Sequence, residues 1–359
     1  MATVARRLPS TFKFPTNATA IVGLGLVALV VVWLFLLFIG QRSDFVEVFL
    51  IGLTTGCIYA LVALGYTLVY GILELINFAH GDVFMLGGMV SATVAASVFG
   101  LVSGQTGVVV WLSVFGTLVI AMAFCGTLNA SIEFVAYRPL RGAPRLAPLI
   151  TAIGMSFILQ NVGLAWKGPN YIEVVDVLPH SKVFSVGGVD YQWNKLIVVL
   201  ITLPVLGVLV WLVERTRQGK AMRATAQDQD AAAMMGINVN RTISFTFLIA
   251  GALAGAAGLL YALYATNIRY DQGFQLGLIA FTAAVLGGIG NLPGAVLGAI
   301  LIGLIQSFNE GLSAVHLSGV RIPGPPGSDW TQSIVFAILI LILVFRPEGL
   351  LGERTPEGG

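Results

Sequence analysis

The longest uncharged stretch of the chain, residues 83–132, contains no Asp, Glu, Lys or Arg. At a rise of about 1.5 Å per residue, it is too long for one crossing of a hydrocarbon core about 30 Å thick. It must therefore fold back, and residues 100–107 supply the turn chemistry with Gly, Ser, Gln and Thr. Over the whole chain only 10 % of residues are charged, whereas soluble domains carry about 25 %. The chain is predicted to be a polytopic membrane protein.

Other uncharged runs have the length of one or two crossings. Residues 21–39 form a run that is longer than the apolar core of a signal peptide, so an uncleaved first span is predicted. Residues 272–309 are long enough for two passes. These runs predict an all-α polytopic membrane protein with about ten transmembrane helices, two of the apolar segments being interrupted. The remaining runs are residues 50–73, 146–166, 196–213, 242–268 and 330–345.

The Lys and Arg residues predict the orientation, because short cytoplasmic loops are enriched in them. They concentrate in four segments that an even number of predicted crossings separates, so both termini are expected in the cytoplasm. The segments are residues 1–20, 138–145, 214–241 and 346–359. The expected domains are an N-terminal tail with an extra span, a permease domain containing a cytoplasmic insert at 214–241, and a C-terminal tail. Their ranges are 1–44, 45–351 and 352–359.

A first break interrupts the apolar pattern between residues 71 and 88. It carries Glu74, Asn77, His80, Gly81 and Asp82, and the apolar sequence then resumes at once. Polar groups at membrane depth mainly face a bundle interior or a water-filled path. A broken helix that places Asn77, His80, Gly81 and Asp82 along a substrate path is therefore predicted. The alternatives are a short cytoplasmic turn, a structural histidine, and acids that only stabilise helix ends.

A second break, at residues 286–294, reads Leu-Gly-Gly-Ile-Gly-Asn-Leu-Pro-Gly and has no charge. Interrupted apolar segments in corresponding halves of a chain point to a transporter whose site lies between two repeats. Gly288 and Gly290 are therefore predicted to line the path with the first break. This pairing rests on hydropathy alone, because residue-by-residue identity between the halves is not visible.

The insert at 214–241 has the composition of two short helices outside the membrane. Asp228 is predicted to cap the second helix, and Gly236 to end it. Its three alanines and two methionines form a small, soft surface that a groove in a cytoplasmic partner would accept. The alternative is an ordinary basic loop that is retained inside by the charge rule.

Several classes of function lack their motifs. Gly219 and Lys220 precede Ala221, so the Ser or Thr of a phosphate loop is missing. None of the three histidines stands in a His-Glu-x-x-His pattern, and Cys57 and Cys125 lie in apolar segments. No basic patch is interleaved with aromatic residues, which argues against a nucleic-acid partner. We therefore predict no catalytic residue, metal or cofactor in this chain, and any ATP hydrolysis must occur in another subunit.

Six motifs in order resemble the LivH-type permease of branched-chain amino acid ABC importers, over about residues 45–351. In the first half they are GLTTGCIYAL at 52–61, NFAHGD at 77–82 and YRPLR at 137–141. In the second half they are AQD with MGI at 226–237, LGGIG with PG at 286–294 and the closing RP at 346–347. The chain departs from shorter members in its extra N-terminal span and in the length of the loop at 313–330.

The resemblance implies an importer-type ABC permease fold in the bacterial cytoplasmic (inner) membrane, surrounded by lipid. It implies pairing with a second, LivM-like permease, two cytoplasmic ATPase subunits that use ATP and Mg, and an extracytoplasmic solute-binding protein. The insert would then dock on an ATPase. The expected coupling residues are Arg223, Gln227, Asp228, Ala232, Met235 and Gly236.

Branched-chain amino acids are the expected solutes, and urea or short-chain amides are the alternative, since relatives with similar motifs are associated with them. A different class of function is an ion-coupled carrier or channel that acts alone, with Glu74, His80 and Asp82 as proton sites. A membrane-embedded enzyme ranks last, because the sequence offers neither a nucleophile with a base nor a metal cluster.

Overall fold

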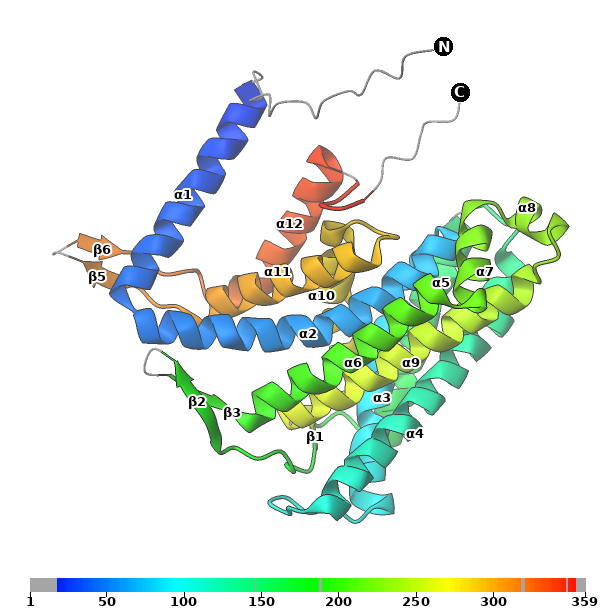
Figure 1. Cartoon of the computed structure of the whole chain (residues 1–359), viewed down its shortest axis with the longest axis horizontal. Helices are drawn as coiled ribbons and strands as arrows, with labels where there is room; N and C mark the ends of the chain where they lie inside the picture. Colours follow the sequence, from blue (N-terminus) through cyan, green and yellow to red (C-terminus); the bar gives the residue numbers. More distant parts are fainter. Residues whose placement is uncertain (1–17, 145, 187–188, 318–319, 347, 353–359) are drawn as a thin grey trace, which may run out of the picture.

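The described part of the chain is mainly helical in the computed structural model, and helix α1 (Ala18–Gly40) projects from the bundle that the other long helices form (Figure 1). Residues 1–17 of the predicted N-terminal region 1–44, residues 353–359 of the predicted C-terminal tail 352–359, and also Arg145 and Pro347, lie outside the described residues. The described residues are 18–144, 146–186, 189–317, 320–346 and 348–352. Their α-helices are α1 (Ala18–Gly40), α2 (Arg42–Leu73), α3 (Ala79–Thr93), α4 (Val108–Ile132), α5 (Leu146–Lys167), α6 (Trp193–Arg215), α7 (Arg217–Gln227), α8 (Gln229–Met234), α9 (Val239–Ala265), α10 (Gln272–Gly287), α11 (Leu292–Gly311) and α12 (Thr331–Phe345).

Eight helical segments of the described chain are long and apolar enough to cross a membrane, and two shorter apolar helices accompany them. The shorter two are Ala28–Gly40 and Gln272–Gly287. Together these ten segments correspond to the predicted crossings, so the all-α polytopic fold is confirmed. The predicted turn at residues 100–107 also exists, between η1 (Val94–Val98) and α4.

Three small antiparallel strand pairs lie at one end of the bundle. β1 (Ile172–Glu173) pairs with β4 (Asn267–Ile268), β2 (Lys182–Val186) with β3 (Val189–Gln192), and β5 (Val315–Leu317) with β6 (Val320–Ile322). Helices α7 and α8 lie at the opposite end (Figure 1). We call these two ends the hairpin end and the insert end.

Glycines bring the central helices close together. A Cβ atom added at Gly251 of α9 would lie 2.3 Å from the Cys125 carbonyl oxygen of α4. One added at Gly303 of α11 would lie 2.6 Å from the Cα of Gly56 of α2. Small residues allow such close backbone approach in membrane bundles. The small-residue face of α9 is therefore a helix-packing face, as its sequence indicates.

The two halves of the bundle repeat the same order of helices in opposite directions. In each half a long helix, α2 or α9, ends at a left-handed residue, and a shorter helix, α3 or α10, follows. Those residues, Glu74 (φ 51°) and Thr266 (φ 56°), are the two non-glycine residues with positive φ in the described chain. Helix α4 packs on α9 as α11 packs on α2, and α3 contacts α10. This is the arrangement of an inverted repeat.

The repeat corrects the expected pairing of the two breaks. The structural counterpart of the first break begins at Thr266, and not within residues 286–294. The segment from 267 to 271 carries Asn, Ile, Arg, Tyr and Asp, so a search for Gly and Pro does not find it. A residue in the left-handed conformation ends α9, so this break needs neither Gly nor Pro.

The N-terminal helix and the long loop at 313–330 pack against each other at the hairpin end. The indole of Trp33 in α1 donates a 2.9 Å hydrogen bond to the Pro323 carbonyl oxygen. The side chain of Gln41 donates to the Ser313 carbonyl oxygen at 3.2 Å. A small apolar core of Leu37, Val48, Leu312 and Ile322 joins the two segments. Both departures from the shorter relatives thus form one structural unit.

Candidate solute path and coupling site

The first break returns the chain into the bundle before α3 begins. A Cβ atom added at Gly65 of α2 would lie 2.1 Å from His80 Nε2, so the glycine makes room for this imidazole. Gly65 precedes the end of α2 by eight residues, or about 12 Å along the helix axis. The five-residue link after Leu73 therefore runs back along α2. Helix α3 starts inside the bundle, and not at its insert end.

Helix α10 also starts inside the bundle, where its first turns cross the start of α3. A Cβ atom added at Gly81 would lie 2.4 Å from the Gly273 carbonyl oxygen and 2.8 Å from the Gly277 Cα. One added at Gly273 would lie 2.8 Å from Oδ1 of Asp82. The N-termini of two discontinuous helices therefore meet at a carboxylate. Such helix ends at a repeat interface are the typical location of a transporter site.

Polar side chains around this crossing are buried and only partly hydrogen-bonded. Asn77, His80 and Asp82 are each at most 1 % exposed. The Tyr137 hydroxyl donates to Asn77 Oδ1 at 2.7 Å, and Ser156 of α5 donates to Asp82 Oδ2. Asn77 Nδ2 and Asp82 Oδ1 have no partner among the described residues. Buried polar atoms are rarely left unpaired without a functional reason, so Asn77, His80, Gly81 and Asp82 remain the predicted path residues.

The Tyr137 hydrogen bond can be tested by removing one hydroxyl. Tyr137→Phe leaves Asn77 Oδ1 buried without its donor, so we expect the free energy of unfolding to fall by about 1–3 kcal/mol. Unfolding in mixed detergent micelles measures this change. Tyr70→Phe on α2 is the control, because the Tyr70 hydroxyl makes no described hydrogen bond. An equal loss in both variants would show that the bond to Asn77 contributes nothing.

The structure places Gly288 and Gly290 away from this crossing. They form the turn between α10 and α11 at the insert end, with φ of 110° and 92°. The segment after α12 covers the turn, since Leu350 N–H donates to the Leu286 carbonyl oxygen at 2.8 Å. A Cβ atom added at Gly288 would lie 2.4 Å from the Gly352 nitrogen. Positive φ explains both glycines locally, and close backbone packing adds to the requirement at Gly288.

The insert folds as the two predicted short helices, each with its own cap. Thr216 accepts from the Gly219 N–H at 3.0 Å and begins α7. Asp228 Oδ1 accepts from the N–H groups of Asp230 and Ala231 at 2.9 Å each and begins α8. Gly236, with φ of 83°, ends the turn that follows α8. The predicted roles of Asp228 and Gly236 in shaping the insert agree with this geometry.

Two methionines are the large apolar side chains that are exposed among the described residues of the insert. Met234 and Met235 are each 83 % exposed, whereas Ala232 is buried at 4 %. Gln227 is exposed, and Arg223 donates to the Val213 carbonyl oxygen at the end of α6. Ala232 and Arg223 therefore hold the insert together. Met235 and its neighbour Met234, the second of the two methionines of the predicted surface, are the side chains that a partner would contact.

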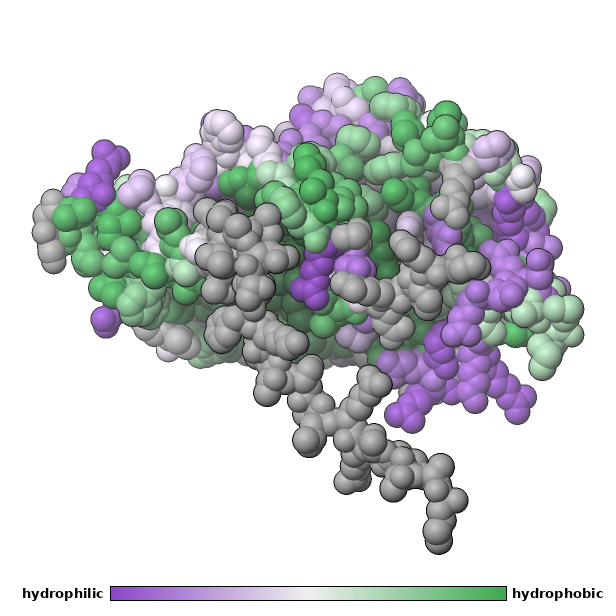
Figure 2. Space-filling model, turned by 90° about the horizontal axis from the view of Figure 1, so that it is seen from above, coloured by the Kyte–Doolittle hydropathy of each residue, from purple (hydrophilic) through white to green (hydrophobic). Residues whose placement is uncertain are grey.

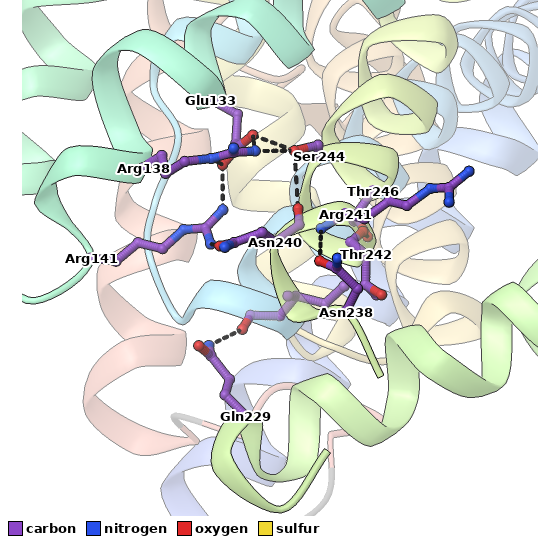
Figure 3. A network of polar contacts seen from close by, with 11 residues as sticks. Glu133, Arg138, Arg141, Gln229, Asn238, Asn240, Arg241, Thr242, Ser244 and Thr246 are labelled. Atoms are coloured by element: carbon purple, nitrogen blue, oxygen red, sulfur yellow. Dashed lines mark hydrogen bonds and ion pairs between the residues drawn. The ribbon is translucent and has the colours of Figure 1, made fainter. Parts of the chain in front are cut away.

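A buried ion-pair network joins the ends of α4 and α9 beside the insert (Figure 3). Glu133 is completely buried, and its carboxylate accepts from Arg138 at 3.1 Å, from Ser244 at 2.7 Å, and from Arg141. Arg141 also donates to Asn240 Oδ1. Burial lowers the pKa of Arg141, while the Glu133 carboxylate acts in the opposite direction. Glu133 is therefore the buried centre of this network.

Short contacts connect the insert with the path. The first residue of α8, Gln229, donates to the Ile72 carbonyl oxygen at 3.3 Å, near the end of α2 (Figure 3). Asn238 follows α8 and caps α9, because its Oδ1 accepts from the Arg241 N–H at 3.0 Å. Tyr137 lies in η2 (Glu133–Tyr137), which also contains Glu133, and reaches Asn77. A displacement of α8 would therefore act on helices α2 and α9, which flank the polar crossing.

Hydropathy differs along the molecular surface. In the view of Figure 2, hydrophilic residues gather toward the end that carries α7 and α8, and hydrophobic residues cover much of the middle. Exposed apolar side chains on α4 and α5 include Phe115 (64 %) and Ile150 (67 %). Apolar side chains exposed on long helices are expected where lipid surrounds a bundle.

Comparison with known proteins gives one family. The family model described as "Branched-chain amino acid transport system / permease component" matches residues 48–344. The permease protein BraD of Pseudomonas aeruginosa is 39 % identical over 309 residues, which cover 85 % of this chain and 95 % of BraD. LivH of Escherichia coli K12 is 39 % identical over 312 residues, with the same coverage of 85 % and 95 %. Both are described as high-affinity branched-chain amino acid transport system permease proteins.

A more distant relative comes from an archaeon. The probable branched-chain amino acid transport permease LivH of Methanocaldococcus jannaschii is 26 % identical over 302 residues, which cover 81 % of this chain and 88 % of that protein. No solved structure matches the chain.

Proposed function

The chain belongs to the family of branched-chain amino acid transport permeases, and from this premise we propose that it moves branched-chain amino acids inward through the crossing of α3 and α10. It is a permease subunit of an ABC importer, a multi-pass protein of the inner membrane, and a transport subunit rather than an enzyme. The solute, the path and the assembled partners are the proposed part.

The observation that carries the proposed path is the meeting of two helix N-termini at the buried carboxylate of Asp82. Asp82 Oδ1 lies against Gly273 at the start of α10 and has no hydrogen-bond partner among the described residues. In one state the crossing opens toward the hairpin end, and in the other toward the insert end. Because the two repeats have opposite directions, rocking one against the other produces both states from the same contacts.

The proposed source of energy lies in partner subunits, because the sequence lacks a phosphate loop: Ala221 follows Gly219 and Lys220 where Ser or Thr is required. We propose that two cytoplasmic ATPases bind and hydrolyse ATP with Mg, and that each ATPase binds one permease. Helix α8 is the part of this chain that contacts the ATPase. A second, LivM-like permease completes the membrane part, and a solute-binding protein delivers the solute at the hairpin end.

This assembly requires the insert end to face the cytoplasm, with both chain termini on that side. Cysteine substitutions at Thr106 and Lys220, which are exposed at opposite ends, test the orientation. The native Cys57 and Cys125 are buried and should not react. We expect a membrane-impermeant maleimide to label Thr106→Cys on intact cells, and Lys220→Cys only after permeabilisation. The reverse pattern would overturn the proposed orientation.

Reconstitution tests the solute and the energy source together. We expect proteoliposomes with both permeases, the ATPases and the binding protein to accumulate labelled leucine, isoleucine or valine only with ATP and Mg. Urea and acetamide serve as competitors of the alternative solute class. Strong inhibition of uptake by urea or acetamide would indicate that the solute belongs to the alternative class of urea and short-chain amides. Accumulation by this subunit alone in a pH gradient would instead identify a carrier.

A further inference from the structure

A pocket of about 410 Å³ lies between α7 and the first turns of α9. Gln218 of α7 lines one side, and Asn238, Arg241, Thr242 and Phe245 line the other. Helices α6 and α9 can both cross a membrane, α7 begins two residues after α6 ends, and Asn238 directly precedes α9. The pocket therefore lies at the insert end, where the chain leaves one membrane span and enters another.

Hydrogen-bond donors line the pocket and have no partner among the described residues. No dashed line reaches the guanidinium of Arg241 in Figure 3, and this exposed cation forms no ion pair with a described residue. The side-chain oxygen of Asn238 accepts from the Arg241 N–H, which leaves its NH₂ group free, and Gln218 adds a second free carboxamide. None of the described residues that line the pocket is acidic. The pocket therefore offers a positive charge and several donors, which suit an anion.

Thr242 supplies the buried polar group of the pocket. It lines the pocket at 3 % exposure, and its hydroxyl has no hydrogen-bond partner among the described residues. A helical threonine can donate to the carbonyl oxygen one turn earlier, as Thr246 does to Thr242 at 3.0 Å. The equivalent acceptor for Thr242, the Asn238 carbonyl oxygen, instead receives the Thr242 backbone N–H. Buried polar atoms are rarely left unpaired without a reason, and a ligand in the pocket would use this hydroxyl.

An apolar stripe leads from the pocket along α9 into its membrane-spanning part. Arg241, Phe245 and Leu248 are spaced four and three residues apart, so they share one face of the helix. Phe245 is half-buried in the pocket wall, and Leu248 beyond it is 40 % exposed. At about 1.5 Å per residue, the stripe extends about 10 Å from the cation toward the middle of the membrane. A ligand that uses the whole surface must therefore carry a negative headgroup and a hydrocarbon chain.

We propose that this pocket binds the phosphate of an anionic phospholipid from the leaflet at the insert end. Basic pockets between membrane helices bind such headgroups. Arg241 pairs with the phosphate, the Thr242 hydroxyl and the free carboxamides donate to its oxygens, and one acyl chain lies along Phe245 and Leu248. Because the pocket joins α7 to α9, the lipid holds the insert at a defined depth beside the membrane. This lipid site does not depend on the solute that the permease transports.

Native mass spectrometry of the full-length chain, released from detergent micelles, counts bound lipid as phosphatidylglycerol is titrated. We expect Arg241→Gln to weaken the tightest binding event about tenfold, through the loss of charge-assisted hydrogen bonds. Arg241 is exposed, so this variant should fold normally. Thr242→Val keeps the shape of the side chain and should weaken binding severalfold. It should not lower the thermal stability of the lipid-free chain, because the hydroxyl has no described partner in the protein.

Lys220→Gln is the matched control. It removes the same charge from an exposed residue of α7 that does not line the pocket, so the affinity for phosphatidylglycerol should not change. Equal weakening by Arg241→Gln and Lys220→Gln would indicate diffuse attraction between charges and would overturn the site.

Two further outcomes would also contradict the proposal. Equal binding of zwitterionic phosphatidylcholine, or displacement of the lipid by equimolar inorganic phosphate, would show that the pocket does not select an anionic phospholipid. Wild-type lipid binding by Arg241→Gln, together with reduced co-purification of the ATPase, would show that Arg241 contacts the ATPase instead.

Discussion

Replacing Met234 and Met235 together by glutamate is expected to reduce ATP-driven uptake by at least about tenfold, the effect of removing a central contact of an interface. Both side chains are 83 % exposed at the tip of the insert, so the variant should fold and insert normally. Two carboxylates would instead be desolvated in the apolar groove that we propose for the ATPase. Uptake and co-purification of the ATPase with the permease measure the effect.

The matched control is Met234→Leu with Met235→Leu, which keeps apolar side chains of similar volume and should retain most of the uptake. Ala232→Glu is not an equivalent test. Ala232 is 4 % exposed and packs inside the insert, so a charge there would disrupt α8 itself. Wild-type uptake by the double glutamate variant, with the ATPase still bound, would remove α8 from the coupling interface.

Replacing Glu133 by alanine is expected to lower the free energy of unfolding by about 3–5 kcal/mol, the usual cost of breaking a buried ion pair. The carboxylate is fully buried and pairs with both Arg138 and Arg141, so its loss leaves two partly buried cations without their anion. Ser244 also loses one of its two acceptors and keeps the Asn240 carbonyl oxygen. Thermal or denaturant unfolding in detergent measures the change.

Glu47→Ala is the control for this prediction. Glu47 is 52 % exposed and lies 3.9 Å from Lys195, so removing this surface pair should cost only about 0–1 kcal/mol. Glu133→Gln should fall between the two, because it keeps the shape and some hydrogen bonds but not the charge. Equal stability of the Glu133→Ala and Glu47→Ala variants would contradict a structural role for the network.

Features with local causes could be predicted from the sequence. The spans follow from apolar length, the turn at residues 100–107 from its small polar residues, and the two insert helices from the cap at Asp228 and the glycine at 236. Each depends on residues that are close together in the chain. The candidate path residues Asn77, His80 and Asp82 stand out as polar groups in an apolar sequence, and the structure buries all three near the start of α3.

Features that depend on contacts between distant segments could not be predicted. Thr266 ends α9 as Glu74 ends α2, yet nothing in its composition marks a break. Glu133 is buried because Arg138, Arg141 and Ser244 surround it, and Ser244 lies 111 residues away in sequence. Gly288 and Gly290 stand out as a break, but they serve a turn that the end of the chain covers. Hydropathy shows where an apolar segment is interrupted. The packing of distant segments determines which residues contact the interruption.

We propose above all that this permease does not hydrolyse ATP itself and that an ATPase subunit binds it at α8. The most direct measurement places a photoreactive amino acid at Met235 and crosslinks the active, co-expressed complex in membranes. We expect a single major adduct with the ATPase subunit, whose yield changes when ATP and Mg are added. An adduct with lipid or with the other permease only, in a complex that still transports with ATP, would contradict the claim.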